Sequence, residues 1–156
     1  MAIFETDFEN FRAEVAPGQR LIGLDLGTKT IGVALSDTMC TVATPMVVLK
    51  KAKLKEDVSA LQAIIDEHGV GGIVLGLPKN MDNSEGPRAQ STRAFARNIE
   101  ERLGLPVLMW DERLSTAAVT RTLIEADASR KRRAEVVDKM AAAYILQGAL
   151  DRLARL

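Results

Sequence analysis

The 156-residue chain has little cysteine, histidine or aromatic side chain, and it has no excess charge of either sign. A single Cys40 and a single His68 exclude a disulfide framework and a zinc site of the usual Cys/His kind. The 21 basic and 21 acidic residues cancel, which argues against coating of nucleic acid by bulk charge. Aromatic residues make up 4% of the chain, so platforms for base stacking are not expected.

Long hydrophobic runs are also missing. No apolar stretch approaches the roughly 18 residues of a membrane span. The N-terminal segment carries Glu5, Asp7 and Glu9, whereas a secretory signal would begin with basic residues. We therefore expect a cytoplasmic protein with no membrane partner. With 47% hydrophobic residues, the chain is long enough for one domain with a sizeable core.

The first 19 residues differ from the rest. Their apolar side chains recur at helical spacing and end before a Pro-Gly pair: Phe4, Phe8, Phe11 and Val15. This pattern predicts an amphipathic N-terminal extension over 1–19 that packs on a main domain over 20–156. Packing is a more typical role for such a segment than recruitment of a partner.

The main domain alternates between strand and helix patterns. Apolar runs predict strands over 21–26, 31–36, 42–49, 72–77 and 106–110. Apolar residues spaced by three and four predict helices over 54–69, 88–103, about 115–125 and 134–153, with a charged link before the last. Short connections make the first three strands an antiparallel meander. The order predicts an α/β fold whose mixed five-stranded sheet, three antiparallel strands and then two parallel ones, has helices on both faces.

Acidic residues occur at three places where a plain core would not have them. Asp25 lies inside an apolar strand, and Asp111 and Glu112 follow the last strand at its carboxyl end. Asp138 shares a helix face with apolar residues three, four, seven and eleven positions later. Carboxylates brought together repel unless a cation lies among them, and ligation by oxygen alone suits Mg²⁺ or Mn²⁺. Such a site is typical machinery for attack of water on a phosphodiester.

Each acid also has a purely structural interpretation. Asp25 can cap the following turn through the amide of Gly27 or Thr28. Asp111 and Glu112 can be acids of a first helical turn, which the helix dipole favours. Asp138 can pair at the surface with Arg133 or Lys139. The joint occurrence of all three acids favours a site.

Four motifs in order over residues 20–150 resemble one family. They are Asp25-Leu26-Gly27-Thr28-Lys29 with Ile31-Gly32-Val33-Ala34, Gly76-Leu77-Pro78 with Ser84-Glu85-Gly86, Asp111-Glu112-Arg113-Leu114-Ser115-Thr116, and Val137-Asp138-Lys139-Met140-Ala141-Ala142. The chain is similar to the YqgF/RuvX family of Holliday junction resolvases, also described as pre-16S ribosomal RNA nucleases.

This resemblance implies an RNase H-like fold, a nuclease dependent on Mg²⁺ or Mn²⁺, and a role in bacterial ribosome maturation through the 5′ end of 16S rRNA. It extends the expected partners to pre-ribosomal particles. Carried over by motif, the catalytic and metal-binding acids are Asp25, Asp138 and either Glu112 or Asp111. The alternative substrate is branched DNA, whose two-fold symmetric cleavage requires a dimer. Both a monomer and a homodimer remain open.

The position of the second acid departs from related resolvases, where it follows the fourth strand. Here that place reads Gly76-Leu77-Pro78. The first and fifth strands would flank the fourth, about 9–10 Å apart. Only a long side chain closes such a gap, which favours Glu112 over Asp111, although loop geometry can reverse this. Thr30 and Asn83 also differ from the residues common in the family, and both differences concern the grip on substrate.

Substrate contacts are expected from polar and basic residues in the first turn, in the loop after the fourth strand, after the fifth strand and before the last helix. They are Lys29, Lys79, Asn80, Asn83, Ser84, Arg113, Arg130, Arg132 and Arg133.

Two other classes share features of this sequence. The segment Asp25–Lys29 also resembles the phosphate loop of actin-like and sugar-kinase ATPases, but those enzymes enclose a nucleotide between two such domains. A non-catalytic module bound to RNA or ribosomes is compatible with the neutral charge, whereas the intact set of acids favours a nuclease.

Overall fold

The computed structural model describes residues 2–80, 82–114 and 130–156, and over 130–138 it describes only the course of the helix. Six strands are described: β1 (Ile3–Phe4), β2 (Arg20–Leu26), β3 (Thr30–Ser36), β4 (Ala43–Lys50), β5 (Val70–Leu77) and β6 (Val107–Asp111). The helical elements are α1 (Phe8–Glu14), α2 (Leu54–His68), α3 (Pro87–Leu103), the short 3-10 helix η1 (Glu112–Leu114) and α5 (Arg130–Leu153). None of these helices is long and apolar enough to span a membrane.

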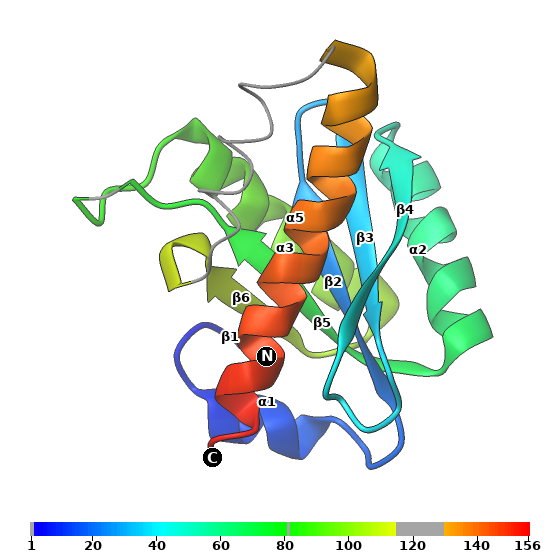
Figure 1. Ribbon diagram of the computed structural model, residues 1–156, viewed down its shortest axis with the longest axis vertical. Helices are drawn as coiled ribbons and strands as arrows, with labels where there is room; N and C mark the ends of the chain where they lie inside the picture. Colours follow the sequence, from blue (N-terminus) through cyan, green and yellow to red (C-terminus); the bar gives the residue numbers. More distant parts are fainter. Residues whose placement is uncertain (1, 81, 115–129) are drawn as a thin grey trace.

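The strands form one mixed sheet in the order β1-β6-β5-β2-β3-β4 (Figure 1). β2, β3 and β4 pair antiparallel, and β5 pairs parallel with both β2 and β6. The predicted meander followed by two parallel strands is therefore confirmed. The register aligns Leu24 of β2 with Leu75 of β5, and Leu75 with Met109 of β6. The carboxyl ends of these three strands consequently meet at one edge.

The number of strands is six rather than the predicted five. The additional strand, β1, pairs parallel with β6 through Ile3 and Phe4. Two residues are too few to show the alternation by which a strand is recognised in a sequence. The helix expected in this extension is present, but it begins only after Asp7, whose side chain accepts a hydrogen bond from the Asn10 amide.

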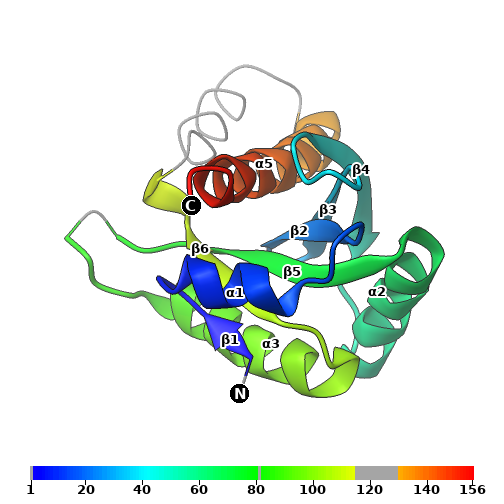
Figure 2. The same ribbon diagram turned by 90° about the horizontal axis from the view of Figure 1, so that it is seen from below.

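Helices cover both faces of the sheet, as Figure 2 shows. α2 and α3 pack on one face over a core of large aliphatic side chains, which include Leu24, Ile73 and Leu75. α5 packs on the other face, where α1 joins it and Phe8 and Phe11 contact its cluster. We call these the α2/α3 face and the α5 face. The predicted layers on both sides are confirmed.

Small residues let α5 approach the sheet closely. A Cβ atom on Gly23 of β2 would lie 2.6 Å from Leu146 Cβ and 2.9 Å from the Ala142 carbonyl oxygen. A Cβ on Gly148 of α5 would lie 2.9 Å from the Trp110 ring. Since these distances are shorter than ordinary carbon contacts, the glycines set the separation between helix and sheet.

α5 begins at Arg130, four residues before the expected start. The basic run Arg130–Arg133 therefore lies in its first turn and is not the predicted link. Lys and Arg are good helix formers, so the run continues the helical pattern of the residues that follow. The helix expected over about 115–125 lies outside the described residues.

Candidate active site

Asp25 lies near the carboxyl end of β2 and belongs to the α5 face. Successive side chains of a strand point to opposite faces, and Asp25 shares its face with Gly23, which contacts α5. Its exposed fraction is 3%. The amide of Gly27 donates a hydrogen bond to the Thr30 carbonyl, so it is engaged within the turn. A buried carboxylate on this face fits a cation site better than a cap of the Gly27 amide.

Glu112 brings a second buried carboxyl group to the same face. It is the first residue of η1 and is 4% exposed. Its Cδ atom lies 3.4 Å from the point where a Cβ atom of Gly76 would be. Gly76 occupies the register position next to Asp25, because Leu24 and Leu75 are paired. The side chain of Glu112 therefore crosses over β5 at a glycine, toward the strand that carries Asp25.

Asp111 has a different environment, although it precedes Glu112 directly. It pairs in register with Leu77 of the α2/α3 face. Its carboxylate accepts hydrogen bonds from Arg113, at 2.6 Å from Nη2 and 3.0 Å from Nε. These bonds hold the pKa of Asp111 below its usual value of 3.8. Because Asp111 is engaged by an arginine and Glu112 turns to the α5 face, the geometry favours Glu112 as the partner of Asp25.

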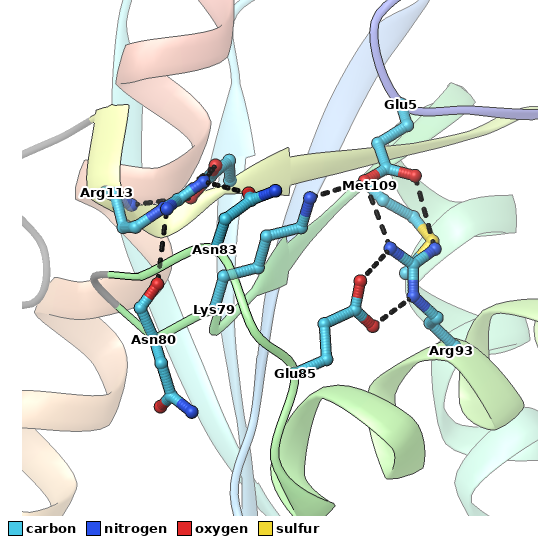
Figure 3. A network of polar contacts seen from close by, with 9 residues as sticks. Glu5, Lys79, Asn80, Asn83, Glu85, Arg93, Met109 and Arg113 are labelled. Atoms are coloured by element: carbon cyan, nitrogen blue, oxygen red, sulfur yellow. Dashed lines mark hydrogen bonds and ion pairs between the residues drawn. The ribbon is translucent and has the colours of Figure 1, made fainter.

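Arg113 also joins the end of β6 to the loop after β5, as Figure 3 shows. Its guanidinium donates to the Asn80 carbonyl at 3.2 Å and to Asn83 Oδ1 at 3.0 Å. Within the loop, Asn80 and Ser84 form a backbone and a side-chain hydrogen bond. Asn83 has a φ of 72°, a conformation that asparagine tolerates better than most residues. Four predicted substrate-binding residues of this group, Asn80, Asn83, Ser84 and Arg113, thus shape one exposed loop.

The base of the same loop is held by ion pairs with the N-terminal segment (Figure 3). Lys79 Nζ lies 3.1 Å from Glu5 Oε1, and Arg93 bridges Glu5 to Glu85. Hydrogen bonds from Arg93 lower the pKa values of both Glu5 and Glu85. Lys79, a predicted substrate contact, is therefore engaged with a carboxylate in this structure.

The other predicted site residues are placed less completely. Lys29 is exposed in the turn between β2 and β3. The acid at position 138 and the basic residues at 130, 132 and 133 lie on α5, with their side chains outside the described part. Among the described residues there is no group of three or more side chains of the metal-binding types. The structure thus brings two of the predicted acids, Asp25 and Glu112, to one face.

Sequence reasoning missed two features of this site. One is the space beside Gly76 that Glu112 and Ile145 occupy. A glycine inside an apolar strand is a signal that could have indicated it. The other is the set of ion pairs around Arg93, which joins residues 88 positions apart in sequence and leaves no local pattern.

The donor set fits a hard divalent cation. Asp25 and Glu112 offer only oxygen ligands, which Mg²⁺ and Mn²⁺ prefer. Both carboxyl groups are nearly inaccessible to water, a setting in which a cation offsets the cost of two negative charges.

Comparison with known proteins agrees with this fold. A family model described as RuvX, Holliday junction resolvase, matches residues 19–152. A protein of Cereibacter sphaeroides (strain ATCC 17025) named "Putative pre-16S rRNA nuclease" is 63% identical over 145 residues, 93% of this chain and 91% of its own. A protein of the same name from Paramagnetospirillum magneticum is 62% identical over 139 residues, covering 89% and 90% of the two chains.

Among solved structures, Thermus thermophilus RuvC in complex with a Holliday junction substrate superposes with a TM-score of 0.55. The match covers 87% of this chain and 96% of RuvC at 10% identity, so it concerns the fold alone. The sheet and its two helical layers define an α/β protein with an RNase H-like fold. The family match and the relatives named nucleases make it a hydrolase of phosphodiester bonds. The chain belongs to the RuvX family.

Proposed function

We propose that the protein is a divalent-metal-dependent nuclease that processes the 5′ end of pre-16S rRNA during ribosome maturation. The observation that carries this proposal is the pair of buried carboxyl groups, Asp25 and Glu112, on one face across Gly76. The names of relatives 63% and 62% identical support the RNA substrate. We expect the activity in the bacterial cytoplasm, on naked precursor or on pre-ribosomal particles.

In this proposal Asp25, Glu112 and Asp138 hold Mg²⁺ or Mn²⁺, and Asp111 does not. When bound, such an ion activates water and stabilises the charge that develops on the phosphate. Asp25 and Glu112 contribute fixed negative charge in a site that α5 shields from bulk water, so no carboxylate has to reorganise during the reaction.

Binding of the substrate strand falls to residues around this edge of the sheet. Lys29 and the loop fastened by Arg113 flank the two acids, and the first turn of α5 adds three arginines and a lysine. These residues contact phosphates, which position the strand without reading its sequence. The extension over 1–19 acts as a structural support, since Glu5 holds the base of the loop through Lys79 and Arg93.

A second candidate substrate is branched DNA. The family description, Holliday junction resolvase, favours it. Symmetric cutting of a four-way junction requires two active sites related by a two-fold axis. A dimer in solution together with cleavage of a synthetic junction would support this candidate, and a monomer that cuts RNA would support the first.

The test compares two neighbouring acids with a matched substitution. Purified protein is incubated with a 5′-extended 16S precursor in Mg²⁺, Mn²⁺, Ca²⁺ or EDTA, and the cleavage rate is measured. We expect cleavage in Mg²⁺ or Mn²⁺ only, because these small ions enforce the octahedral geometry that positions water. Glu112→Gln should abolish most of it, whereas Asp111→Asn should keep the rate within about tenfold of the parent.

Full activity in EDTA contradicts the metal requirement. Loss of activity in Asp111→Asn with normal activity in Glu112→Gln contradicts the assignment of the second acid. Asp138→Asn tests the third acid: a normal cleavage rate in that variant returns Asp138 to the surface-pair interpretation.

A further inference from the structure

A second hollow at the end of β2 lies on the sheet face opposite the two acids. It has a volume of about 540 Å³ and lies between the β2–β3 turn, the start of α2 and the part of α3 from Pro87 to Asn98. Leu26, Leu54 and Phe95 form its apolar part. All three belong to the core of the α2/α3 face or pack against it. The site proposed above does not include this groove.

The polar lining of the groove is cationic at its rim. Lys51 and Arg88 line it and are both exposed. The ion pairs formed within the described part of the chain include neither side chain. Arg88 donates one hydrogen bond to the Leu26 carbonyl at 3.2 Å, which uses one of the five N–H donors of its guanidinium. Both charges are therefore available to an anion.

Neutral donors and one acid complete the lining. Thr28, Ser91 and Asn98 offer hydroxyl and amide groups. The acid, Asp57, is 4% exposed, and its Oδ1 accepts a hydrogen bond from the Ala52 amide at 2.9 Å. Because this buried carboxylate is engaged by the backbone before α2, the accessible charge at the rim is positive. An anion with several oxygen acceptors fits this combination of cations and donors.

Adjacent residues of β2 belong to the acid pair and to the groove. Asp25 and Leu26 are consecutive, with Cα atoms about 3.8 Å apart, and they point to opposite faces. The turn that follows is narrow, because the Gly27 amide bonds the Thr30 carbonyl at 2.8 Å. On its far side, the Lys51 amide donates to the Lys29 carbonyl at 2.9 Å, which brings the exposed Lys29 beside the groove. The β2–β3 turn, whose Gly27 and Thr28 line the groove, therefore lies between the groove and Asp25.

We propose that this groove binds a phosphate group of the substrate strand beyond the scissile phosphodiester, with Lys51 and Arg88 as its cationic ligands. The inference rests on the proposed nuclease function, because it assigns a second contact to the same strand. The ligand is the phosphodiester backbone, common to RNA and DNA. Contact with phosphate gives affinity and register without sequence preference.

The test measures binding separately from cleavage. A fluorescently labelled 16-nucleotide single-stranded RNA is titrated with protein in EDTA, and anisotropy gives Kd at several salt concentrations. Lys51→Gln combined with Arg88→Gln should weaken binding roughly tenfold at 0.1 M salt and reduce the slope of log K against log salt by about 0.7, the contribution of one single-strand phosphate contact.

The matched control replaces two cations of the same helices that do not line the groove. Lys55 of α2 and Arg97 of α3 are also exposed, and Lys55→Gln with Arg97→Gln makes the same change in net charge. This control should keep the Kd and the salt slope of the parent. Equal losses in both double variants would show a general charge effect and overturn the proposal, as would no loss in the groove variant. Unchanged melting temperatures establish that both variants are folded.

Two further arms define the ligand. A DNA oligonucleotide of the same length should lose affinity to the same extent, and a loss restricted to RNA would overturn the assignment to phosphate. A three-nucleotide RNA, too short to span both sites, should show a smaller difference between parent and groove variant than the 16-nucleotide RNA, and an equal difference would overturn the placement of the groove beyond the scissile phosphodiester. Both proposals are supported if Glu112→Gln loses cleavage but binds RNA as the parent does, and if the groove variant loses binding. A parent that binds RNA through the groove but never cleaves it overturns the nuclease proposal alone.

Discussion

The two faces of the central strands differ although they alternate residue by residue along the same chain. On the α2/α3 face, β2 and β5 present large aliphatic side chains: Ile22, Leu24, Leu26, Ile73, Leu75 and Leu77. On the α5 face three of the four intervening positions are small or acidic, namely Gly23, Asp25 and Gly76, and the fourth is Val74. In β2 and β5 the α2/α3 face therefore buries mainly large side chains, whereas the α5 face, which has its own apolar cluster, also admits a close helix and two carboxyl groups. Along β2 and β5, positions that bury large aliphatic side chains on the α2/α3 face thus alternate with positions on the side of the candidate site.

The sharpest test of this division is the acid of the α5 face. Asp25→Asn should lower the cleavage rate by about a thousandfold, because stabilisation by a bound ion worth several kcal/mol is lost at 1.36 kcal/mol per factor of ten. Its stability without metal should be unchanged or higher, since the amide removes a buried charge. Cleavage assays and thermal unfolding in EDTA measure the two effects. Unfolding of the variant, with no protection of the parent by metal, would identify Asp25 as a structural cap.

The opposite pattern is expected from the aliphatic face. Leu75 is fully buried, and Leu75→Ala should lower the free energy of unfolding by about 2–5 kcal/mol through lost burial and a cavity. The cleavage rate of the folded fraction should remain that of the parent. Urea unfolding and single-turnover cleavage at low temperature give both numbers. A large loss of rate in this variant would show that the two faces are not independent.

Gly76 joins the two functions, so its substitution should affect both by intermediate amounts. The Cβ atom of Gly76→Ala would lie 2.5 Å from Ile145 Cδ1 and 3.4 Å from Glu112 Cδ. The flexible end of Ile145 has to move, which costs about 1–3 kcal/mol of stability. A displaced Glu112 should lower the rate by about 10–100-fold. A rate equal to that of the parent would exclude Glu112 from the site or show that the space at Gly76 is not needed.

The smallest effect is expected at Asp111, the acid turned away from α5. Because hydrogen bonds from Arg113 lower its pKa in the folded protein, the ionised group stabilises the fold above the ordinary value of 3.8. This contribution, about 1 kcal/mol or less, is lost as the pH falls through the lower folded value. Asp111→Asn should therefore be slightly less stable than the parent at pH 7. The difference should shrink as the pH falls below 3.8 and through the lower folded value, which thermal unfolding over pH 2–7 can follow.

The sequence patterns predicted the central sheet well because its strands are long and apolar. Apart from their glycines and Asp25, Leu21–Leu26 and Gly72–Leu77 are hydrophobic throughout, and the short connections favour a meander. The edge strand β1 was not predicted because two residues show no periodic pattern. Its pairing with β6 depends on tertiary contacts. The start of α5 was placed too late because a run of charges is typical of an exposed link as well as of a helix.

The candidate site was predictable only in part. A carboxylate inside an apolar strand is visible in a sequence, and so Asp25 was found. The choice between Asp111 and Glu112 depends on which side chain turns to the α5 face. The longer side chain of Glu112 favours it in the sequence, and its position over Gly76 supports the same choice. The engagement of Lys79 with Glu5 could not be predicted, since it depends on the path of the N-terminal segment past the loop.

The pairing of β1 with β6 has a consequence for folding during synthesis. Ile3 leaves the ribosome first, but its register partner Val107 is made more than a hundred residues later. At 5–20 residues per second this interval lasts about 5–20 s, while the β2–β3–β4 meander forms from local contacts. The segment that becomes β1 thus waits for its partner during this interval, and the outer edge of β6 is covered only after Val107 has been made. The ion pairs of Glu5 with Lys79 and Arg93 likewise join the start of the chain to residues made more than seventy positions later.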